Sequence, residues 1–496
     1  MTNRVRKVLS IFAGPIAFLV LELIGKPDTL SLEAYHVLTI TSWVALWWIT
    51  EAVPISVTAL LPIILFPLTG ALSIAETTQS FGHKYIFLYM GGFMLAIAIE
   101  TWGLHKRIAL NIINIIGSNV TNIILGFMIA TAFLSMWISN TATSVMMLPI
   151  GTAIVSQFKK RTNGDIHEGN SFGKALMLGI AYSASIGGFA TLIGTPPNLV
   201  LAGILQQIYH VKISFVQWMM FGLPTSLLLL FLCWWYLTRH AFSFDQVSFP
   251  GGKSEIKKML VDLGKIQYEE KLVLIVFIFT ALAWMFRSLL EKVIPDLDDT
   301  IIAMVAAVVL FLIPNKDKTR KLINWDEAVK LPWGIILLFG GGMALAKGFT
   351  STGLAEWIAG QMSQLDGLSM FLLILILVTM VNFLTEITSN LATTAMLLPV
   401  LAPMAVSFDL HPYMIMVSVT IAASCAFMLP VATPPNAVVF GSGYLRIPDM
   451  MKAGVWMNIL SIILITITTY FLLPHLWNMD PNQFPESFKT HLNLSN

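Results

Sequence analysis

The chain has 496 residues, of which 56% are hydrophobic and only 11% are charged. Soluble domains carry roughly 25% charged residues, so this composition excludes a water-soluble enzyme and a disordered chain, and it indicates an all-α polytopic membrane protein embedded in a lipid bilayer. The formal net charge of +2 provides no basic surface for nucleic acid, and we expect no nucleic-acid partner.

Eleven apolar segments are long enough, at about 20 residues each, to cross a bilayer as helices. They are 8–25, 34–50, 53–72, 86–104, 175–207, 214–238, 272–290, 299–313, 333–348, 412–440 and 453–475. The first segment follows basic residues, as the apolar part of a signal peptide does. Its apolar run is too long for a signal peptide and no small-residue cleavage site follows it, so we expect a retained first span.

Two further apolar stretches, 122–157 and 367–408, are too long for one span, and polar residues interrupt each of them near its middle. Each is typical of two short helices that meet at a polar tip, as in a re-entrant hairpin. Irregular backbone at membrane depth is tolerated only where it faces protein or a water-filled cavity. The two tips therefore indicate a transport pathway.

Most of the 29 Lys and Arg residues fall on one side of the membrane when the N-terminus is placed in the cytoplasm. Cytoplasmic segments of membrane proteins carry such an excess, so we expect a cytoplasmic N-terminus and an outside C-terminus. In this orientation the first hairpin enters the membrane from the cytoplasm and the second enters from outside.

Three blocks of the first half recur in the second half in the same order. Tyr89–Ala96 resembles Phe339–Ala346, Ser139–Pro149 resembles Ser389–Pro399, and Gly194–Asn198 resembles Ala432–Asn436. An odd number of spans separates the hairpins, which predicts two repeats of inverted topology, an architecture of secondary transporters. We expect an N-terminal segment with the first span (1–33), a first repeat (34–238), a cytoplasmic linker (239–271), a second repeat (272–475) and a C-terminal tail (476–496).

The two polar tips contain Ser139-Asn140-Thr141 and Ser389-Asn390. Ser, Asn and Thr are preferred at helix N-termini, where free N–H groups and a partial positive charge attract anions. Two opposed tips can hold the two ends of a dianion, whereas a single tip can simply cap its own helix. A matched pair inside two repeats favours a ligand site.

Each repeat also contains a Thr-Pro-Pro-Asn sequence, at 195–198 and 433–436, that interrupts a helix. Proline removes N–H groups and frees backbone carbonyls, and the carbonyls near Gly194 and Ala432 are suited to a small cation; the alternative is a plain proline kink. The membrane interior has almost no Lys or Arg, so a bound dianion requires co-bound cations. The hydroxyl candidates for binding them are Ser135, Ser139, Thr385 and Thr388.

Enzyme signatures are lacking in this sequence. No His-Glu-x-x-His zinc motif and no Gly-x-x-x-x-Gly-Lys nucleotide loop occurs, so we expect neither an enzyme nor an ATP-driven pump. The one carboxylate beside a candidate cation ligand is Glu386, and facing water or capping backbone is the favoured interpretation of this residue.

The motif Trp48-Ile49-Thr50-Glu51-Ala52-Val53-Pro54-Ile55, with the two Ser-Asn tips and the two Thr-Pro-Pro breaks, resembles the divalent-anion:sodium symporter family over essentially the whole chain. That family includes sodium/dicarboxylate and sodium/citrate cotransporters. The resemblance implies eleven spans, two hairpins and a homodimer. It also implies an elevator mechanism, in which the hairpins and spans 5, 6, 10 and 11 slide against a scaffold of spans 1–4 and 7–9.

The resemblance further implies which residues bind the cargo. Substrate contacts are expected from Asn140, Thr141, Thr195, Asn390, Thr433 and Pro434. A first sodium site is expected from Ser135, Ser139, Asn140 and Gly194, and a second from Thr385, Thr388, Asn390 and Ala432. The second tip has Leu391 where the family often has Thr, and this difference bears on the choice of substrate.

We therefore expect a secondary transporter in a bacterial plasma membrane that carries small dicarboxylates such as succinate, malate, fumarate or 2-oxoglutarate. Na⁺ is the expected coupling ion if transport is symport, and it is not required if the protein exchanges dicarboxylates. Citrate and sulfate are alternative substrates. An anion channel, which would conduct without saturation, and an intramembrane enzyme, for which no catalytic pair is visible, are the alternatives from other classes.

Overall fold

The computed structural model describes residues 3–116, 119–161, 166–242, 244, 252–362 and 369–489. Parts of the expected linker (243 and 245–251) and of the expected C-terminal tail (490–496) lie outside the described residues. Within the described ranges the regular structure is helical, and one isolated antiparallel bridge joins Pro314 to Lys321. The prediction of an all-α protein is confirmed for this part of the chain.

The described residues of the first half form twelve α-helices, with a 3₁₀ turn at Ser80–Gly82 and a π-helical turn at Leu237–Ala241. The helices are α1 (Asn3–Ile24), α2 (Leu32–Thr50), α3 (Ile55–Thr58), α4 (Leu61–Thr69), α5 (Ile74–Gln79), α6 (Lys84–Thr101), α7 (Leu104–Ile116), α8 (Val120–Ser135), α9 (Asn140–Arg161), α10 (Ile166–Gly188), α11 (Pro196–Tyr209) and α12 (Phe215–Tyr236).

The second half continues in the same manner, with a π-helical turn at Thr468–Leu472. Its helices are α13 (Gly252–Asp262), α14 (Tyr268–Met285), α15 (Arg287–Leu290), α16 (Asp299–Leu312), α17 (Trp325–Ala328), α18 (Trp333–Ser351), α19 (Leu354–Met362), α20 (Met370–Leu384), α21 (Asn390–Ser407), α22 (Pro412–Ala423), α23 (Pro434–Phe440), α24 (Ile447–Ile467), α25 (Leu473–Trp477) and α26 (Glu486–Lys489).

Six described helical stretches are long and apolar enough to cross a membrane. They are Ile74–Thr101, Asn140–Lys159, Phe215–Ala241, Trp333–Ser351, Asn390–Ser407 and Ile447–Trp477. Six shorter apolar helices accompany them, among them Val120–Ser135 and Met370–Leu384. Large apolar side chains such as Phe279, Val305 and Leu23 are exposed on the outer surface, as expected where a helix faces lipid.

The interruptions expected from polar and proline residues are present as breaks between helices. Each expected hairpin is a helix pair: α8 and α9 meet across 136–139, and α20 and α21 meet across 385–389. The segment 175–207 is broken at 189–195, and the segment 412–440 is broken at 424–433. The expected single span at 53–72 is instead two short helices, α3 and α4, because Pro54 and Pro62 each favour the start of a new helix.

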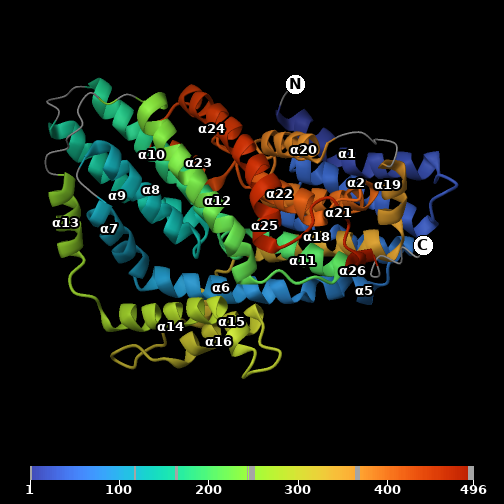
Figure 1. Cartoon of the computed structure of the whole chain (residues 1–496), viewed down its shortest axis with the longest axis horizontal. Helices are drawn as coiled ribbons and strands as arrows, with labels where there is room; N and C mark the ends of the chain where they lie inside the picture. The colour runs from blue at the N-terminus through green and yellow to red at the C-terminus, as the bar shows by residue number, and fades with distance from the viewer. Residues whose placement is uncertain are drawn as a thin grey trace.

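Figure 1 shows α8, α9 and α10 side by side at one end of the molecule and α1 with α2 towards the other, while α6 runs beside α14 and α16 along one edge. The two halves are interleaved in the middle. Helices α9 and α10 of the first half pack against α23, and α11 packs against α18, α21 and α22. This interleaving brings the breaks of both halves to a common centre.

Candidate functional site: a polar pocket at the helix breaks

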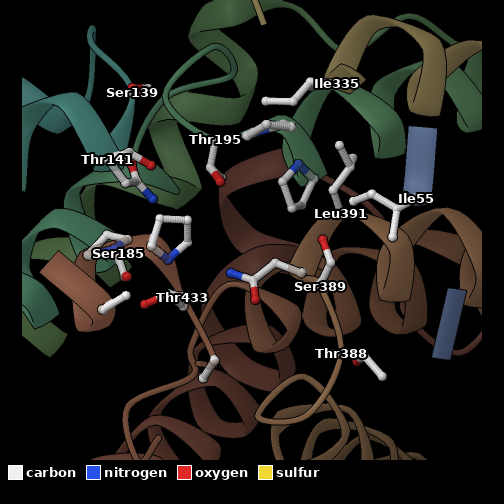
Figure 2. Close-up of a pocket in the computed structure, with 18 of the residues that line it drawn as sticks. Ile55, Ser139, Thr141, Ser185, Thr195, Ile335, Thr388, Ser389, Leu391 and Thr433 are labelled. Carbon is white, nitrogen blue, oxygen red and sulfur yellow. The ribbon is translucent and has the colours of Figure 1, made fainter. Parts of the chain in front are cut away.

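A pocket of about 590 Å³ lies where the helix breaks meet. All six expected substrate contacts line this pocket: Asn140, Thr141, Thr195, Asn390, Thr433 and Pro434. Figure 2 shows labelled residues of both tips and both Thr-Pro-Pro breaks around one shared space. A volume of this size is typical of small-molecule sites, which are roughly 300–1,000 Å³.

Two long helices begin at the pocket, so their N-termini are directed at whatever occupies it. Helix α9 has 22 residues and begins at Asn140, and α21 has 18 residues and begins at Asn390. Free N–H groups and the helix dipole make such N-termini favourable for an anion. Helices α11 and α23 also begin at the pocket, but each starts with two prolines that lack N–H groups. Thr195 and Thr433 line the pocket at these starts, and the Thr433 hydroxyl accepts a hydrogen bond from the Asn436 N–H group of its own helix.

Below the first tip, the hydroxyl group of Ser135 lies within hydrogen-bond distance of two acceptor oxygens. The Oγ atom of Ser135 lies 2.6 Å from Oδ1 of Asn140 and 2.7 Å from the carbonyl oxygen of Ala184. A serine hydroxyl has one proton to donate, so one of these two acceptors is left without it. An excess of neutral oxygen acceptors in a fully buried place is the chemistry that a small hard cation requires.

The second repeat builds the same cluster 250 residues later. The Oγ1 atom of Thr385 lies 2.8 Å from Oδ1 of Asn390 and 2.9 Å from the carbonyl oxygen of Ala423. Thr388, another expected ligand, lines the pocket and forms a 2.6 Å hydrogen bond with Thr393. The hydroxyl, amide oxygen and carbonyl oxygen of the two clusters therefore match, whereas Thr388 has no hydroxyl counterpart in the first repeat.

Gly194 lies so close to neighbouring carbonyl groups that no side chain fits at this position. A Cβ atom built there would lie 2.3 Å from the oxygen of Gly188 and 3.0 Å from the oxygen of Ser135. The backbone of the break thus packs closely against the carbonyl groups of Gly188 and Ser135, and the role of Gly194 as a backbone ligand stays a prediction. Ala432, its counterpart, lines the pocket beside the second cluster.

Both breaks are held open by the asparagine of the Thr-Pro-Pro-Asn sequence. Asn198 donates from Nδ2 to the carbonyl oxygens of Phe189 (3.3 Å) and Thr191 (2.7 Å). Asn436 donates in the same way to Ala426 (3.3 Å) and Leu429 (3.0 Å). Both side chains are fully buried, so these bonds fix the unwound segments that sequence reasoning could identify only as proline breaks.

Glu386 caps the second break and does not face the pocket. Its Oε1 atom accepts hydrogen bonds from the backbone N–H groups of Phe427 (2.7 Å) and Met428 (2.9 Å), and its Oε2 atom accepts one from Leu429 (3.0 Å). Asn458 of α24 donates a fourth bond from Nδ2 over 2.8 Å. The favoured interpretation of this carboxylate as a backbone cap is therefore confirmed. The position 250 residues earlier is Met136, so the first break is held differently, by the hydroxyl of Thr191 on the Met136 carbonyl oxygen (2.6 Å).

Sequence reasoning did not single out three polar residues that line the pocket. Ser185 of α10 and Tyr89 of α6 are nearly fully buried, and Glu51 ends α2 in a left-handed conformation with φ of 46°. Glu51 is the one charged residue among the described residues that line the pocket. The one sequence signal for α6 is the recurrence of Tyr89–Ala96 at Phe339–Ala346, because the other two recurring blocks form the tips and the breaks of the site. Ile55, Phe93 and Ile335 form an apolar part of the wall nearby.

The expected sodium ligands fall into two groups. Ser139, Asn140, Gly194, Thr388, Asn390 and Ala432 line the pocket, whereas Ser135 and Thr385 lie just beneath it and reach it through the two asparagines. Among the described residues no cluster of three or more His, Cys, Asp or Glu side chains is placed to hold a metal ion. The described cation-binding potential is therefore that of neutral oxygens, which suits Na⁺ and not a transition metal.

Two solved structures share this fold at low sequence identity. MtrF of Neisseria gonorrhoeae, described as illuminating a class of antimetabolite efflux pumps, has a TM-score of 0.58 and 13% identity, with 92% of this chain and 98% of that chain covered. The YdaH transporter of Alcanivorax borkumensis has a TM-score of 0.56 and 12% identity, with coverage of 80% and 87%. These likenesses concern the fold.

Curated relatives are much closer in sequence. Proteins named sodium-dependent dicarboxylate transporter SdcS are 47% identical in Staphylococcus saprophyticus, over 97% of this chain and 94% of the relative, and 45% identical in Staphylococcus aureus strain RF122, over 96% and 93%. A family model described as the sodium:sulfate symporter transmembrane region matches residues 5–477. The family model and the named relatives, together with the helical fold and the apolar surface, thus define a membrane transporter. The chain belongs to the sodium:sulfate symporter family, and the predicted family resemblance is confirmed.

Proposed function

We propose that the chain is a sodium-coupled carrier of small dicarboxylates such as succinate, malate, fumarate or 2-oxoglutarate. The observation that carries the proposal is the duplicated oxygen cluster: Ser135 with Asn140 and Thr385 with Asn390 lie beneath two helix N-termini in one pocket. The pocket has no Lys or Arg among its described lining residues. Helix dipoles supply only about half a charge each, so two bound cations would provide the remaining compensation for a dianion. The relatives named sodium-dependent dicarboxylate transporters support the same cargo.

We also propose the expected transport cycle. The dianion and two Na⁺ ions load at the tips, and the hairpins with spans 5, 6, 10 and 11 carry them past a scaffold of spans 1–4 and 7–9. Eleven spans, inverted repeats with the expected boundaries and a homodimer in a bacterial plasma membrane complete the proposal, with the N-terminus cytoplasmic and the C-terminus outside. The interleaving of the two halves at the pocket supports a cycle in which both tips move together.

Uptake of labelled succinate into proteoliposomes tests the proposal directly. Uptake is measured with an inward Na⁺ gradient or with choline, into empty or succinate-loaded vesicles. We expect uptake into empty vesicles only with Na⁺, with saturation and with stimulation by internal succinate. Uptake only into loaded vesicles, without dependence on Na⁺, would show an exchanger. Flux without saturation would show a channel, and lack of uptake would direct the assay to citrate and sulfate.

A further inference from the structure

A second cavity, of about 490 Å³, lies between the end of α12 and the beginning of α24. None of its described lining residues lines the transport pocket. They include Trp235, His240, Asp449, Lys452 and Trp456. The cavity is therefore a separate feature that transport of the cargo does not explain.

The charge of this cavity is positive. Asp449 forms a 2.7 Å ion pair with Lys174, so its carboxylate is already compensated. Lys452 lines the cavity, is exposed and forms no ion pair with a described carboxylate. Arg239 does not line the cavity, but it is exposed on the π-helical turn directly before the lining residue His240. One uncompensated lysine in the cavity wall and an exposed arginine one residue from that wall favour an anionic ligand.

The cavity is also amphipathic in a way that matches the edge of a bilayer. Trp235 and Trp456 flank it with exposed fractions of 42% and 55%, and Trp is enriched where the hydrocarbon region meets the headgroups. From Trp235 an exposed apolar face continues along α12 through Phe231 and Leu228. From Trp456 another continues along α24 through Ile463 and Ile467. The two apolar faces match the two acyl chains of one lipid, and the basic end from which they lead matches its headgroup.

We propose that this cavity binds an anionic phospholipid, with the headgroup phosphate at Lys452 and Arg239 and the acyl chains along α12 and α24. Basic pockets between membrane helices on the cytoplasmic side recognise such headgroups through charge. The two basic residues lie on the side that the distribution of Lys and Arg predicts to be cytoplasmic, where anionic lipid is concentrated.

The lipid would lie on a helix that supports the transport pocket. Asn458, two residues after Trp456 on α24, donates to Glu386 and accepts from the Phe427 N–H group over 3.2 Å. Anchoring α24 in the membrane therefore stabilises the cap of the second break. The binding of lipid does not depend on the identity of the cargo, so this proposal and the proposed function can fail separately.

The test is native mass spectrometry of the delipidated full-length protein, titrated with phosphatidylglycerol, phosphatidylcholine or soluble glycerol phosphate. Each basic group near an anionic lipid contributes about fivefold in affinity. We therefore expect the double variant Arg239→Gln/Lys452→Gln to bind phosphatidylglycerol about 25-fold more weakly, with little change for phosphatidylcholine. The variant Lys257→Gln/Lys258→Gln, which removes two exposed charges from α13, is the matched control and should bind as the wild type does.

Equal affinity of the wild type for the two phospholipids would overturn the proposal, and so would an unchanged phosphatidylglycerol affinity in Arg239→Gln/Lys452→Gln. Full competition by glycerol phosphate at the same concentration would also overturn it, because it would identify a site for a soluble anion. The conservative variant Arg239→Lys/Lys452→Arg keeps both charges. If the glutamine variant does not fold, the conservative variant decides the question. A retained preference of Arg239→Lys/Lys452→Arg for phosphatidylglycerol supports the proposal, and a lost preference contradicts it.

Discussion

Ser135 and Asn140 are joined across the first hairpin tip by a hydrogen bond of 2.6 Å between Oγ and Oδ1. Thr385 and Asn390 repeat this relationship across the second tip at 2.8 Å. In both cases the hydroxyl-bearing residue is fully buried and the asparagine reaches the pocket. Each asparagine therefore contacts a buried oxygen cluster and lines the pocket at the same time, so in the proposed function it would couple cation binding to substrate binding.

Removing the buried hydroxyls should weaken Na⁺ binding more than substrate binding. For Ser135→Ala and for Thr385→Ala we expect the Na⁺ concentration for half-maximal succinate uptake to rise about tenfold, which corresponds to about 1.4 kcal/mol. Thr385→Ser, which keeps the hydroxyl, should remain close to the wild type. The measurement is uptake against Na⁺ concentration at saturating succinate. A raised succinate KM with an unaltered Na⁺ dependence would argue against the two cation sites.

Truncating the tip asparagines should abolish transport without unfolding the protein. Asn140→Ala and Asn390→Ala each remove a polar side chain from the pocket wall, where we propose the cargo binds, and an oxygen from a cluster. We expect uptake to fall at least about a hundredfold, since a charged cargo loses about 3 kcal/mol of hydrogen bonding. Asn111→Ala, on the exposed part of α7, is the control. Elution of the variants as monodisperse peaks verifies folding, and unchanged uptake in both would remove these residues from the site.

Replacing Glu386 should lower the free energy of unfolding, because its carboxylate caps backbone N–H groups. The carboxylate accepts from three N–H groups and from Asn458, so Glu386→Ala leaves buried donors without an acceptor. We expect a loss of about 3–5 kcal/mol in the free energy of unfolding. Glu386→Gln keeps the shape and one acceptor oxygen, so it should lose less stability than Glu386→Ala does. Thermal unfolding in detergent measures both losses, and a fully stable Glu386→Ala would contradict the cap.

A matched pair of threonines offers a test of the asymmetry between the repeats. Thr393 shares a 2.6 Å hydrogen bond with Thr388, whereas the buried Oγ1 of Thr143 has no hydrogen-bond partner in the described structure, because Ile138 stands where the second repeat has Thr388. We expect Thr393→Val to lower the free energy of unfolding by about 1–2 kcal/mol and Thr143→Val to leave it unchanged or raise it. Thermal unfolding of both variants checks this, and equal losses would show that Thr143 has a partner such as a bound water.

Glu51 should weaken the binding of a substrate that carries a third negative charge, such as citrate. It is the one charged residue among the described pocket lining, and a tricarboxylate would bring an additional carboxylate into the same space. We expect Glu51→Gln to strengthen inhibition of succinate uptake by citrate by about tenfold, or about 1.4 kcal/mol, and to change the succinate KM little. Competition measured at pH 8, where citrate is fully ionised, is the critical case. Equal citrate inhibition in wild type and variant would show that Glu51 does not select the cargo.

The breaks and the pocket were predictable because they depend on local residues. Proline at 196, 197, 434 and 435 cannot continue a helix, and the Ser-Asn tips favour helix starts, so their positions follow from the sequence alone. The repeat then indicated that the breaks belong together. The helices α7 and α19 were not predicted, since both mix polar and apolar residues and a search for continuous apolar segments passes over them.

The contacts of Glu386, Tyr89 and Glu51 were beyond sequence reasoning for a different reason. The carboxylate of Glu386 binds backbone groups 41 to 43 residues away, and its partner Asn458 is 72 residues away. No local pattern marks such a pair, because the N–H groups it caps belong to a segment whose lack of regular structure is itself a result of the fold. Similarly, Tyr89 and Glu51 reach the pocket only through the packing of α2, α6 and α18.

The interleaving of the two halves has a consequence for how the protein is made. The phenol of Tyr182 in α10 donates to the carbonyl oxygen of Phe427 over 2.8 Å, and α9 and α10 pack against α23. A nascent chain that stops in the segment after α12 has one oxygen cluster and one pocket wall, and the surface that should receive α23 is left without its partner. The pocket is therefore complete only when the helices of the second half have docked, because they supply about half of its lining residues.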